Sequence, residues 1–259
     1  GLLGAVANLA VGVGPLLAGQ ILILGWRYLY IIFVVITGIG FIIIFNLKRN
    51  QPKTTSEMEI RVFFLQLGKE IRRTVVLLLI LSAFLVSHTF SATIIWTSRS
   101  FTHVIPENIS SVVILLFGIM GSVSGYIAGI TIKKRGIRFT LSMALISLIM
   151  ADIILVIFGN NSFEALALTT TGLIFMGFAG GLLFTSLMYY SQILSQERRG
   201  ALAGLTTAGL FIGIAFVPTT FEVFFNFGGI SLVYGVILVI SLILIIVLTI
   251  LNMLAKELP

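Results

Sequence analysis

The chain has 259 residues, of which 58% are hydrophobic and only 10% are charged. Soluble domains carry about 25% charged residues, so this composition excludes a domain surrounded by water and indicates a protein solvated mainly by lipid. The absence of cysteine excludes disulfides, thiolate–metal sites and cysteine nucleophiles. The net charge of +7 does not indicate a nucleic-acid partner, because the basic residues gather in short loops between apolar segments.

Eight apolar segments are each long enough to cross a membrane as a helix, which takes about 20 residues. In chain order they are 1–24, 28–46, 74–98, 109–132, 139–158, 165–190, 200–225 and 230–254. A closed β-barrel is the other structure that spans a bilayer, and its strands alternate polar and apolar residues. Runs such as VVLLLILSAFLV do not alternate, so the sequence predicts an all-α, polytopic transmembrane protein.

The basic residues predict the orientation of these spans. When eight spans alternate in direction, all but two of the 16 basic residues fall on one side of the membrane; the exceptions are Arg27 and Arg99. Cytoplasmic loops carry the excess of Lys and Arg, so we expect the basic side to be cytoplasmic. The C-terminus then lies in the cytoplasm, and the expected location is the plasma membrane.

The longest predicted loop, 47–73, is strongly basic and divides the chain unequally. Two spans precede it in 1–46, and six spans follow it in 74–259. Six spans after a basic central loop are typical of one half of a two-bundle transporter. The two spans of 1–46 then correspond to the end of the other half, and the chain corresponds to part of a longer membrane protein.

The first span contains small residues and a proline at regular spacing. Gly1 is followed by Ala10, by Gly14-Pro15 and by Ala18-Gly19. Small residues spaced three or four apart let two helices approach closely in lipid, and Pro15 kinks the helix. The pattern resembles the fifth-span signature of the drug–proton antiporter branches of the major facilitator superfamily, with Ala in place of Gly at positions 10 and 18.

A basic loop and an internal repeat extend this resemblance. In GITIKKRGIR, the register of Gly129, Lys133-Lys134, Gly136 and Arg138 is similar to a loop motif of the family, although Lys133 stands where the family has Asp. Gly200, Gly209 and Gly213 reproduce the spacing of Gly1, Ala10 and Gly14 at an offset of 199 residues, as expected for the two halves of a transporter.

The resemblance covers the whole chain and implies that its eight spans are the fifth to twelfth of twelve. It implies a secondary transporter that works by alternating access and exports small amphipathic or hydrophobic compounds in exchange for protons. The closest alternative is a facilitator that imports a sugar or an organic acid. Two further alternatives are a membrane scaffold and an intramembrane enzyme, and no cluster of catalytic groups supports the enzyme.

Ionisable residues at membrane depth are the first candidates for a substrate or proton pathway. Three lie within the spans, namely His88, Asp152 and Glu222. Hydroxyl groups near His88 and along the span 165–190 extend the set to Ser91, Thr93, Thr170 and Tyr189. For each candidate the alternative is a structural hydrogen bond between packed helices, and Gly121, Gly125 and Gly129 are interpreted as packing contacts. The sequence shows no metal-ligand cluster and no phosphate-binding loop, so no cofactor is expected.

Overall fold

The computed structural model describes residues 1–21, 25–49, 68–102, 104–159, 162–195 and 198–255. These residues form the helices α1 (Leu2–Ile21), α2 (Trp26–Arg49), α4 (Thr74–Phe101), α5 (Glu107–Arg135), α6 (Ile137–Phe158), α7 (Leu166–Ile193) and α8 (Arg199–Leu254). No strand occurs within the described ranges, and every one of these helices is long and apolar enough to cross a membrane. The prediction of an all-α transmembrane protein is therefore confirmed.

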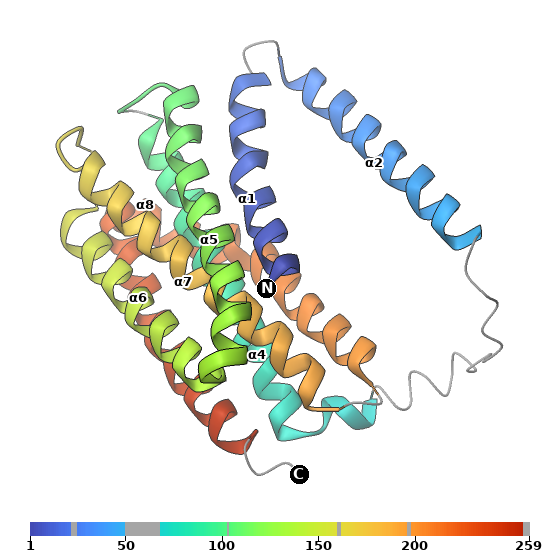
Figure 1. Cartoon of the computed structure of the whole chain (residues 1–259). Coiled ribbons are helices and arrows are strands. Elements are labelled where there is room, and N and C mark those ends of the chain that lie inside the picture. The colour runs from blue at the N-terminus through green and yellow to red at the C-terminus, as the bar shows by residue number, and fades with distance from the viewer. Residues whose placement is uncertain (22–24, 50–67, 103, 160–161, 196–197, 256–259) are drawn as a thin grey trace.

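Helix α8 accounts for the two last predicted spans. Its 56 residues would extend for roughly 84 Å as one rod, against a hydrocarbon core of about 30 Å. The backbone leaves helical geometry at Gly228 and Gly229, and Gly229 has a φ of 64°, a conformation that favours glycine. The two halves run in opposite directions, orange and red in Figure 1. They correspond to the predicted spans 200–225 and 230–254.

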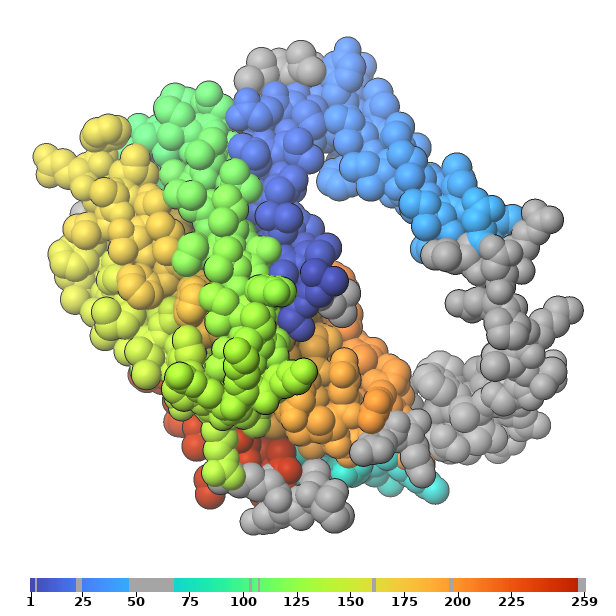
Figure 2. Space-filling view, in the orientation of Figure 1, coloured from blue at the N-terminus to red at the C-terminus, as the bar shows by residue number. Residues whose placement is uncertain are grey.

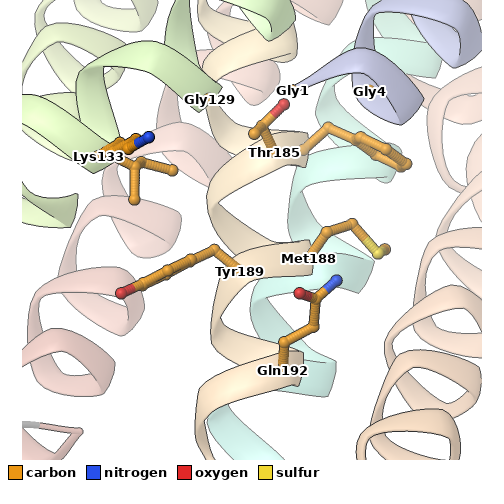
Figure 3. A pocket seen from close by; sticks show the side chains of 10 residues that line it. Gly1, Gly4, Gly129, Lys133, Thr185, Met188, Tyr189 and Gln192 are labelled. Atoms are coloured by element: carbon orange, nitrogen blue, oxygen red, sulfur yellow. The ribbon is translucent and has the colours of Figure 1, made fainter.

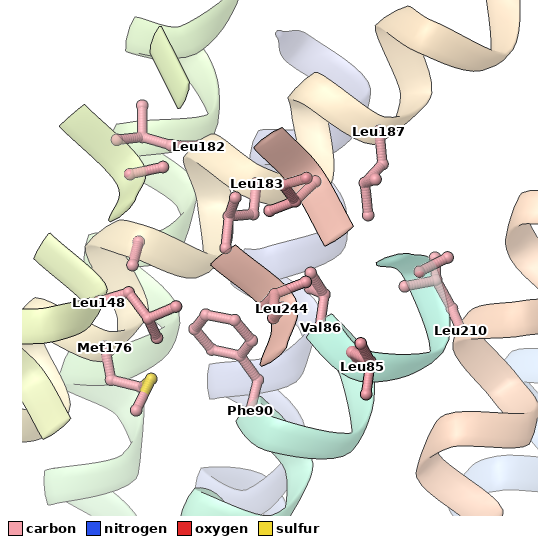
Figure 4. Packing of buried hydrophobic residues seen from close by; sticks show 14 of the residues in the cluster. Leu85, Val86, Phe90, Leu148, Met176, Leu182, Leu183, Leu187, Leu210 and Leu244 are labelled. Carbon is pink, nitrogen blue, oxygen red and sulfur yellow. The ribbon is translucent and has the colours of Figure 1, made fainter. Parts of the chain in front are cut away.

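Helices α4 to α8 form one bundle, and α1 packs on its α5 side (Figure 1). The most extensive helix pairs are α4 with α8, α1 with α5, α5 with α7 and α6 with α7. Figure 4 shows the centre of the bundle, where Val86 and Phe90 of α4 lie near Leu183 of α7 and Leu244 of α8. All four belong to one cluster of buried apolar side chains, which holds the helices in fixed positions around the polar residues described below.

Glycine permits the closest helix contacts on α7. A Cβ atom on Gly177 would collide with the backbone carbonyl of Phe117, and one on Gly181 would collide with Gly121 and Ser124 of α5. Lipid tails are as apolar as leucine, so close packing of small residues is the main way in which helices associate in a membrane. The sequence interpretation of Gly121 as a packing contact is therefore confirmed.

Helix α2 stands apart from the bundle, as Figures 1 and 2 show. None of its residues from 26 to 46 is buried, although the segment has the apolar composition of a membrane span. The two helices of 1–46 therefore differ in their packing: α1 packs on α5, whereas α2 does not pack on the bundle. Most of the predicted loop 47–73 lies outside the described residues.

The basic residues gather at one end of the bundle. The described cations at the start of α4, the end of α5 and the starts of α6 and α8 all belong to helix ends that lie at the bottom of Figure 1, beside the C-terminus. At the opposite end, the guanidinium of Arg99 lies over the rings of Trp96 and Phe225, 4.9 and 5.0 Å from their centroids. The predicted asymmetry of charge is therefore present in the folded chain.

A buried carboxylate joins two helices at the basic end. Glu70 is only 7% exposed and accepts hydrogen bonds from Arg73, at 2.9 Å, and from Arg198, at 2.5 Å. Arg73 precedes α4 and Arg198 precedes α8, so the carboxylate connects the segment before α4 to the start of α8. Both arginine side chains are about one-third exposed, which weakens each ion pair by solvent screening.

We expect Glu70→Gln to lower the stability of the bundle by about 1–3 kcal/mol. The substitution leaves two partly exposed guanidinium groups beside a neutral amide, which weakens two charge-assisted hydrogen bonds. Thermal unfolding of the detergent-solubilised protein measures the change. Glu164→Gln is the matched control, because Glu164 is exposed and makes no ion pair with the described residues. Equal effects of the two substitutions would contradict a structural role for Glu70.

Candidate functional site

His88 lies at the midpoint of α4 and is 4% exposed. Its Nδ1 is 2.8 Å from the carbonyl oxygen of Gly213 in the first half of α8. A carbonyl only accepts hydrogen bonds, so Nδ1 carries the hydrogen and donates it. Within the described residues this bond occupies Nδ1, which leaves Nε2 as the ring nitrogen through which His88 can exchange a proton.

Two aromatic rings hold the imidazole of His88 in place. The ring of Phe84 is stacked on it at 5.3 Å, and the ring of Phe221 lies against it at 5.2 Å, between centroids. Gly213 is required at this point, because a Cβ atom there would collide with Ser87 and with the carbonyl of Phe84. The repeat that singled out Gly213 in the sequence thus marks the residue that lets α8 come close enough to bind His88.

The hydroxyl groups around His88 are mostly bonded within α4. Thr93 is fully buried and donates to the carbonyl of Thr89 at 3.0 Å, while Ser91 is half-buried. One turn further, Thr97 and Tyr234 form a 2.7 Å hydrogen bond between α4 and the second half of α8. Thr93 therefore has the bond expected of a structural residue, and Ser91 is the freer of the two sequence candidates.

A cavity of about 390 Å³ lies near the basic end, where α1, α5 and α7 meet. Figure 3 shows Thr185, Met188, Tyr189 and Gln192 along α7, with Lys133 of α5 on the side toward which Tyr189 extends. Phe184 and Ile132 add apolar surface. The cavity offers hydroxyl, amide and ammonium groups beside apolar side chains, which suits an amphipathic molecule.

Sequence reasoning found only part of this cavity. Tyr189 was a candidate, and Lys133 and Gly129 belong to the predicted loop motif, whereas Met188 and Gln192 were missed. The helical spacing of Thr185, Met188 and Gln192 is a signal that places them on one face. Thr170 does not line the cavity; it lies near the other end of α7 and donates to the carbonyl of Leu166 at 2.7 Å.

The other two ionisable candidates lie apart from the cavity. Asp152 of α6 is 1% exposed and lies beside the hydroxyl of Ser241 in the second half of α8, although neither side chain makes a well-formed hydrogen bond. Glu222 of α8 is exposed and follows Phe221, whose ring touches His88. Glu222 is thus adjacent in sequence to a residue that touches His88, but within the described residues it makes no hydrogen bond or ion pair with His88, and neither does Asp152.

We expect Asp152→Asn to leave the stability of the bundle unchanged or to raise it slightly. A buried carboxylate without a cationic partner is costly, and an amide of the same shape carries no charge. Thermal unfolding of the variant measures this effect. Asp152→Leu is the informative comparison, because it also removes the polar contact to Ser241. If Asp152→Asn unfolds many degrees earlier than the unsubstituted protein, the carboxylate has a charged partner that the described residues do not include.

The loop motif forms the turn between α5 and α6. Gly136 has a φ of 85°, a left-handed conformation that favours glycine, and its N–H bonds to the carbonyl of Ile132 at 3.0 Å. Lys133, Lys134 and Arg138 are exposed around this turn. Gly136 thus has a structural explanation, and of the three cations at this turn Lys133 also lines the cavity between α1, α5 and α7.

The glycines of α1 pack differently from the expectation for the antiporter-type motif. The closest approach to α5 is at Gly12, where a Cβ atom would lie 2.8 Å from the Cα of Gly118. Gly1 also lies against Gly129, and Gly4 against Thr185. Gly14, by contrast, is exposed, and a Cβ atom there would meet nothing within 4 Å. The expectation that Gly14 makes the close helix contact is corrected, because Gly14 lies on the face of α1 that points away from α5.

The remaining members of that motif lie on both faces of α1. Pro15 is inside the helix and half-buried, and Ala10 is exposed. Gly19 is buried and Ala18 is half-buried. The residues of the motif are thus divided between two faces of α1. One face contacts α5, and the other, which includes Gly14, has no packing partner within the described residues.

Comparison with known proteins gives one positive result. Residues 1–218 match the family model described as Major Facilitator Superfamily. The match includes α1 with its Gly-Pro pair, the α5–α6 turn and the part of α8 that binds His88. No curated protein matches the chain in sequence.

Proposed function

The chain belongs to the Major Facilitator Superfamily and is a secondary membrane transporter, and we propose that it exports small amphipathic or hydrophobic compounds in exchange for protons. Transport proceeds by alternating access, in which two bundles move around a central site. In this proposal His88 carries the proton, and the cavity between α1, α5 and α7 receives the substrate near the basic end.

The observation that carries the proposal is the environment of His88. Imidazole is the side chain that ordinarily gains and loses a proton between pH 5 and 8, and ionisable groups at membrane depth are functional by default. Nδ1 of His88 is fixed on Gly213 at 2.8 Å, so proton exchange is directed to Nε2. Because this bond joins α4 to α8, a change of charge on the ring acts directly on the contact between two helices.

The cavity supports a substrate that is partly apolar. Its volume of about 390 Å³ lies in the range of small-molecule pockets, and it combines Met188 and Phe184 with the polar ends of Tyr189 and Gln192. Ser91, Glu222 and Thr170 stay proposed members of a pathway for substrate or protons, and all three lie outside the lining of this cavity. A sugar importer would require a denser set of hydrogen-bonding groups than this lining offers.

The charge asymmetry supports the orientation. The basic helix ends lie on the side of the C-terminus, and Lys and Arg are enriched in cytoplasmic loops. We therefore place the C-terminus and the cavity mouth in the cytoplasm, with the protein in the plasma membrane. A substrate entering from this side is carried outward.

Efflux from intact cells tests the proposal. Cells that express the protein are loaded with a fluorescent hydrophobic cation, and its loss is followed with and without an inward proton gradient. We expect loss of the dye to accelerate with the gradient and to stop when a protonophore collapses it. Gradient-driven accumulation of a sugar or an organic acid, without dye efflux, would instead establish the nutrient importer.

A further inference from the structure

An apolar groove runs along the outer surface of the bundle, where α5, α6 and α7 meet. It has a volume of about 430 Å³, and its lining includes Met143, Ile146 and Met150 of α6 together with Phe175 and Phe178 of α7. Among the described residues that line it, Ser147 alone carries a hydroxyl, which already donates to the carbonyl of Phe175 at 2.9 Å. This part of the lining therefore offers an occupant no free hydrogen-bonding side chain.

A basic cavity of about 230 Å³ adjoins this groove at the basic end of the bundle. Its lining includes Thr131, Lys134 and Arg135 of α5 and Phe139 of α6, and it shares Met143 with the apolar groove. The guanidinium of Arg135 lies 4.8 Å from the centroid of the Phe139 ring. Lys134 and Arg135 are exposed, and within the described part of the chain neither forms an ion pair with a carboxylate.

The two cavities together have the length of one lipid chain. Phe139, Met143, Ile146 and Met150 lie on one stripe of α6, because they are spaced by three or four residues. From Phe139 to Met150 the helix rises by roughly 16 Å, about half of a 30 Å hydrocarbon core. The basic cavity lies at the helix ends, where headgroups are found, and the apolar groove extends toward the middle of the membrane.

We propose that this groove binds one anionic phospholipid, with its phosphate held by Lys134 and Arg135 and an acyl chain along Met143, Ile146 and Met150. Basic pockets between membrane helices bind acidic headgroups, and the leaflet facing the cytoplasm supplies them. A free phosphate would not use the apolar groove, and an apolar partner helix would leave the two cations without a counter-charge. The assignment to the cytoplasmic leaflet rests on the orientation proposed above, whereas the binding itself does not.

Lipid retention by the purified protein tests this inference independently of transport. The natural protein is solubilised in detergent, incubated with dioleoyl phosphatidylglycerol or dioleoyl phosphatidylcholine, and examined by native mass spectrometry. We expect one phosphatidylglycerol to be retained at concentrations where phosphatidylcholine is not. The double substitution Lys134→Ala with Arg135→Ala is expected to weaken retention about 25-fold, since each cation near the membrane surface contributes about a factor of five.

Two control variants separate this site from general attraction to charge. Lys133→Ala with Arg138→Ala removes two charges from the same turn, but neither residue lines the groove or the basic cavity, so retention is expected to persist. Ile146→Trp fills the apolar groove and should displace the lipid without changing any charge. Ile157→Trp is its matched control, because Ile157 has the same 64% exposure on α6 and lies beyond the groove.

The outcomes are distinct. Equal retention of the two lipids, or equal loss in both double-alanine variants, would overturn the proposed site. A dimer that Ile146→Trp abolishes and that excludes lipid would show that a second copy occupies the groove instead. A protein that fails to retain lipid but still exports its substrate contradicts only this inference, and one that retains lipid without transport contradicts only the proposed function.

Discussion

Replacing His88 with glutamine is expected to reduce proton-driven transport by about 100-fold while leaving the bundle folded. The glutamine amide can donate to the carbonyl of Gly213, as Nδ1 does at 2.8 Å, but it cannot take up a proton. Loss of a positioned group that transfers a proton costs about 10²–10⁴ in rate. The expected defect is therefore specific to coupling.

Exchange without a gradient distinguishes this role from a structural one. Proteoliposomes loaded with unlabelled substrate exchange it for labelled substrate at equal pH on both sides, and this process requires helix movement but no net proton transfer. We expect His88→Gln to retain exchange and to lose the dependence of transport on pH. If exchange and gradient-driven transport fall together, His88 only holds α4 and α8 together. If neither falls, His88 does not carry the proton.

Replacing Gly12 with leucine is expected to separate α1 from α5, whereas the same change at Gly14 is expected to be tolerated. A Cβ atom at Gly12 would lie 2.8 Å from Gly118 Cα and 3.1 Å from the carbonyl oxygen of Leu115, and backbone atoms cannot move aside as a side chain does. Overpacking of this kind costs about 1–3 kcal/mol, and more where backbones touch. At Gly14, nothing lies within 4 Å of the added atom.

The contact is directly measurable by cross-linking, because these 259 residues contain no cysteine of their own. Asn8 of α1 lies against Gly121 of α5, where an added Cβ would be 3.1 Å from that of Asn8. Cysteines introduced at these two positions should form a disulfide on mild oxidation. We expect Gly12→Leu to suppress this cross-link and Gly14→Leu to preserve it. The opposite result would show that the close contact is made by the face that the sequence motif indicated.

The comparison of Gly12 with Gly14 shows where sequence reasoning reached its limit. The repeat predicted that Gly14 and Gly213 occupy equivalent positions, and Gly213 does pack closely, on Ser87 and Phe84 of α4. A motif gives the spacing of small residues but does not identify the helix on which each face packs. A Cβ atom on Gly14 would meet no described residue within 4 Å, so the contact to α5 is made by the neighbouring face of α1, through Gly12.

The membrane spans were predictable because lipid imposes a simple requirement. Each span must satisfy its own backbone groups and present about 20 apolar residues, and both properties are visible in the sequence. The break in α8 was also predictable from length, and Gly228-Gly229 lies between the two expected spans. The contact between Glu70 and Arg198 could not be predicted, because no local pattern in the sequence relates two residues that are 128 positions apart.

The sequence predicted which residues are candidates for the site, but it did not predict which of them lie together in the folded chain. His88 was identified because an ionisable side chain within an apolar span is costly, and the structure adds its partner on α8. Asp152 satisfied the same rule, yet it lies beside Ser241 and away from the cavity. Depth in the membrane is visible in a sequence, whereas the direction in which a side chain faces depends on packing between helices.

The most direct test of the account is to measure proton release while substrate binds or crosses the membrane. Proteoliposomes that contain the natural protein and an internal pH-sensitive dye are supplied with a hydrophobic cation. If the protein exchanges protons for substrate, substrate addition will change the internal pH, and His88→Gln will remove that change while retaining exchange at equal pH. Transport of substrate with no accompanying proton movement, in the unsubstituted protein, would contradict the proposed coupling.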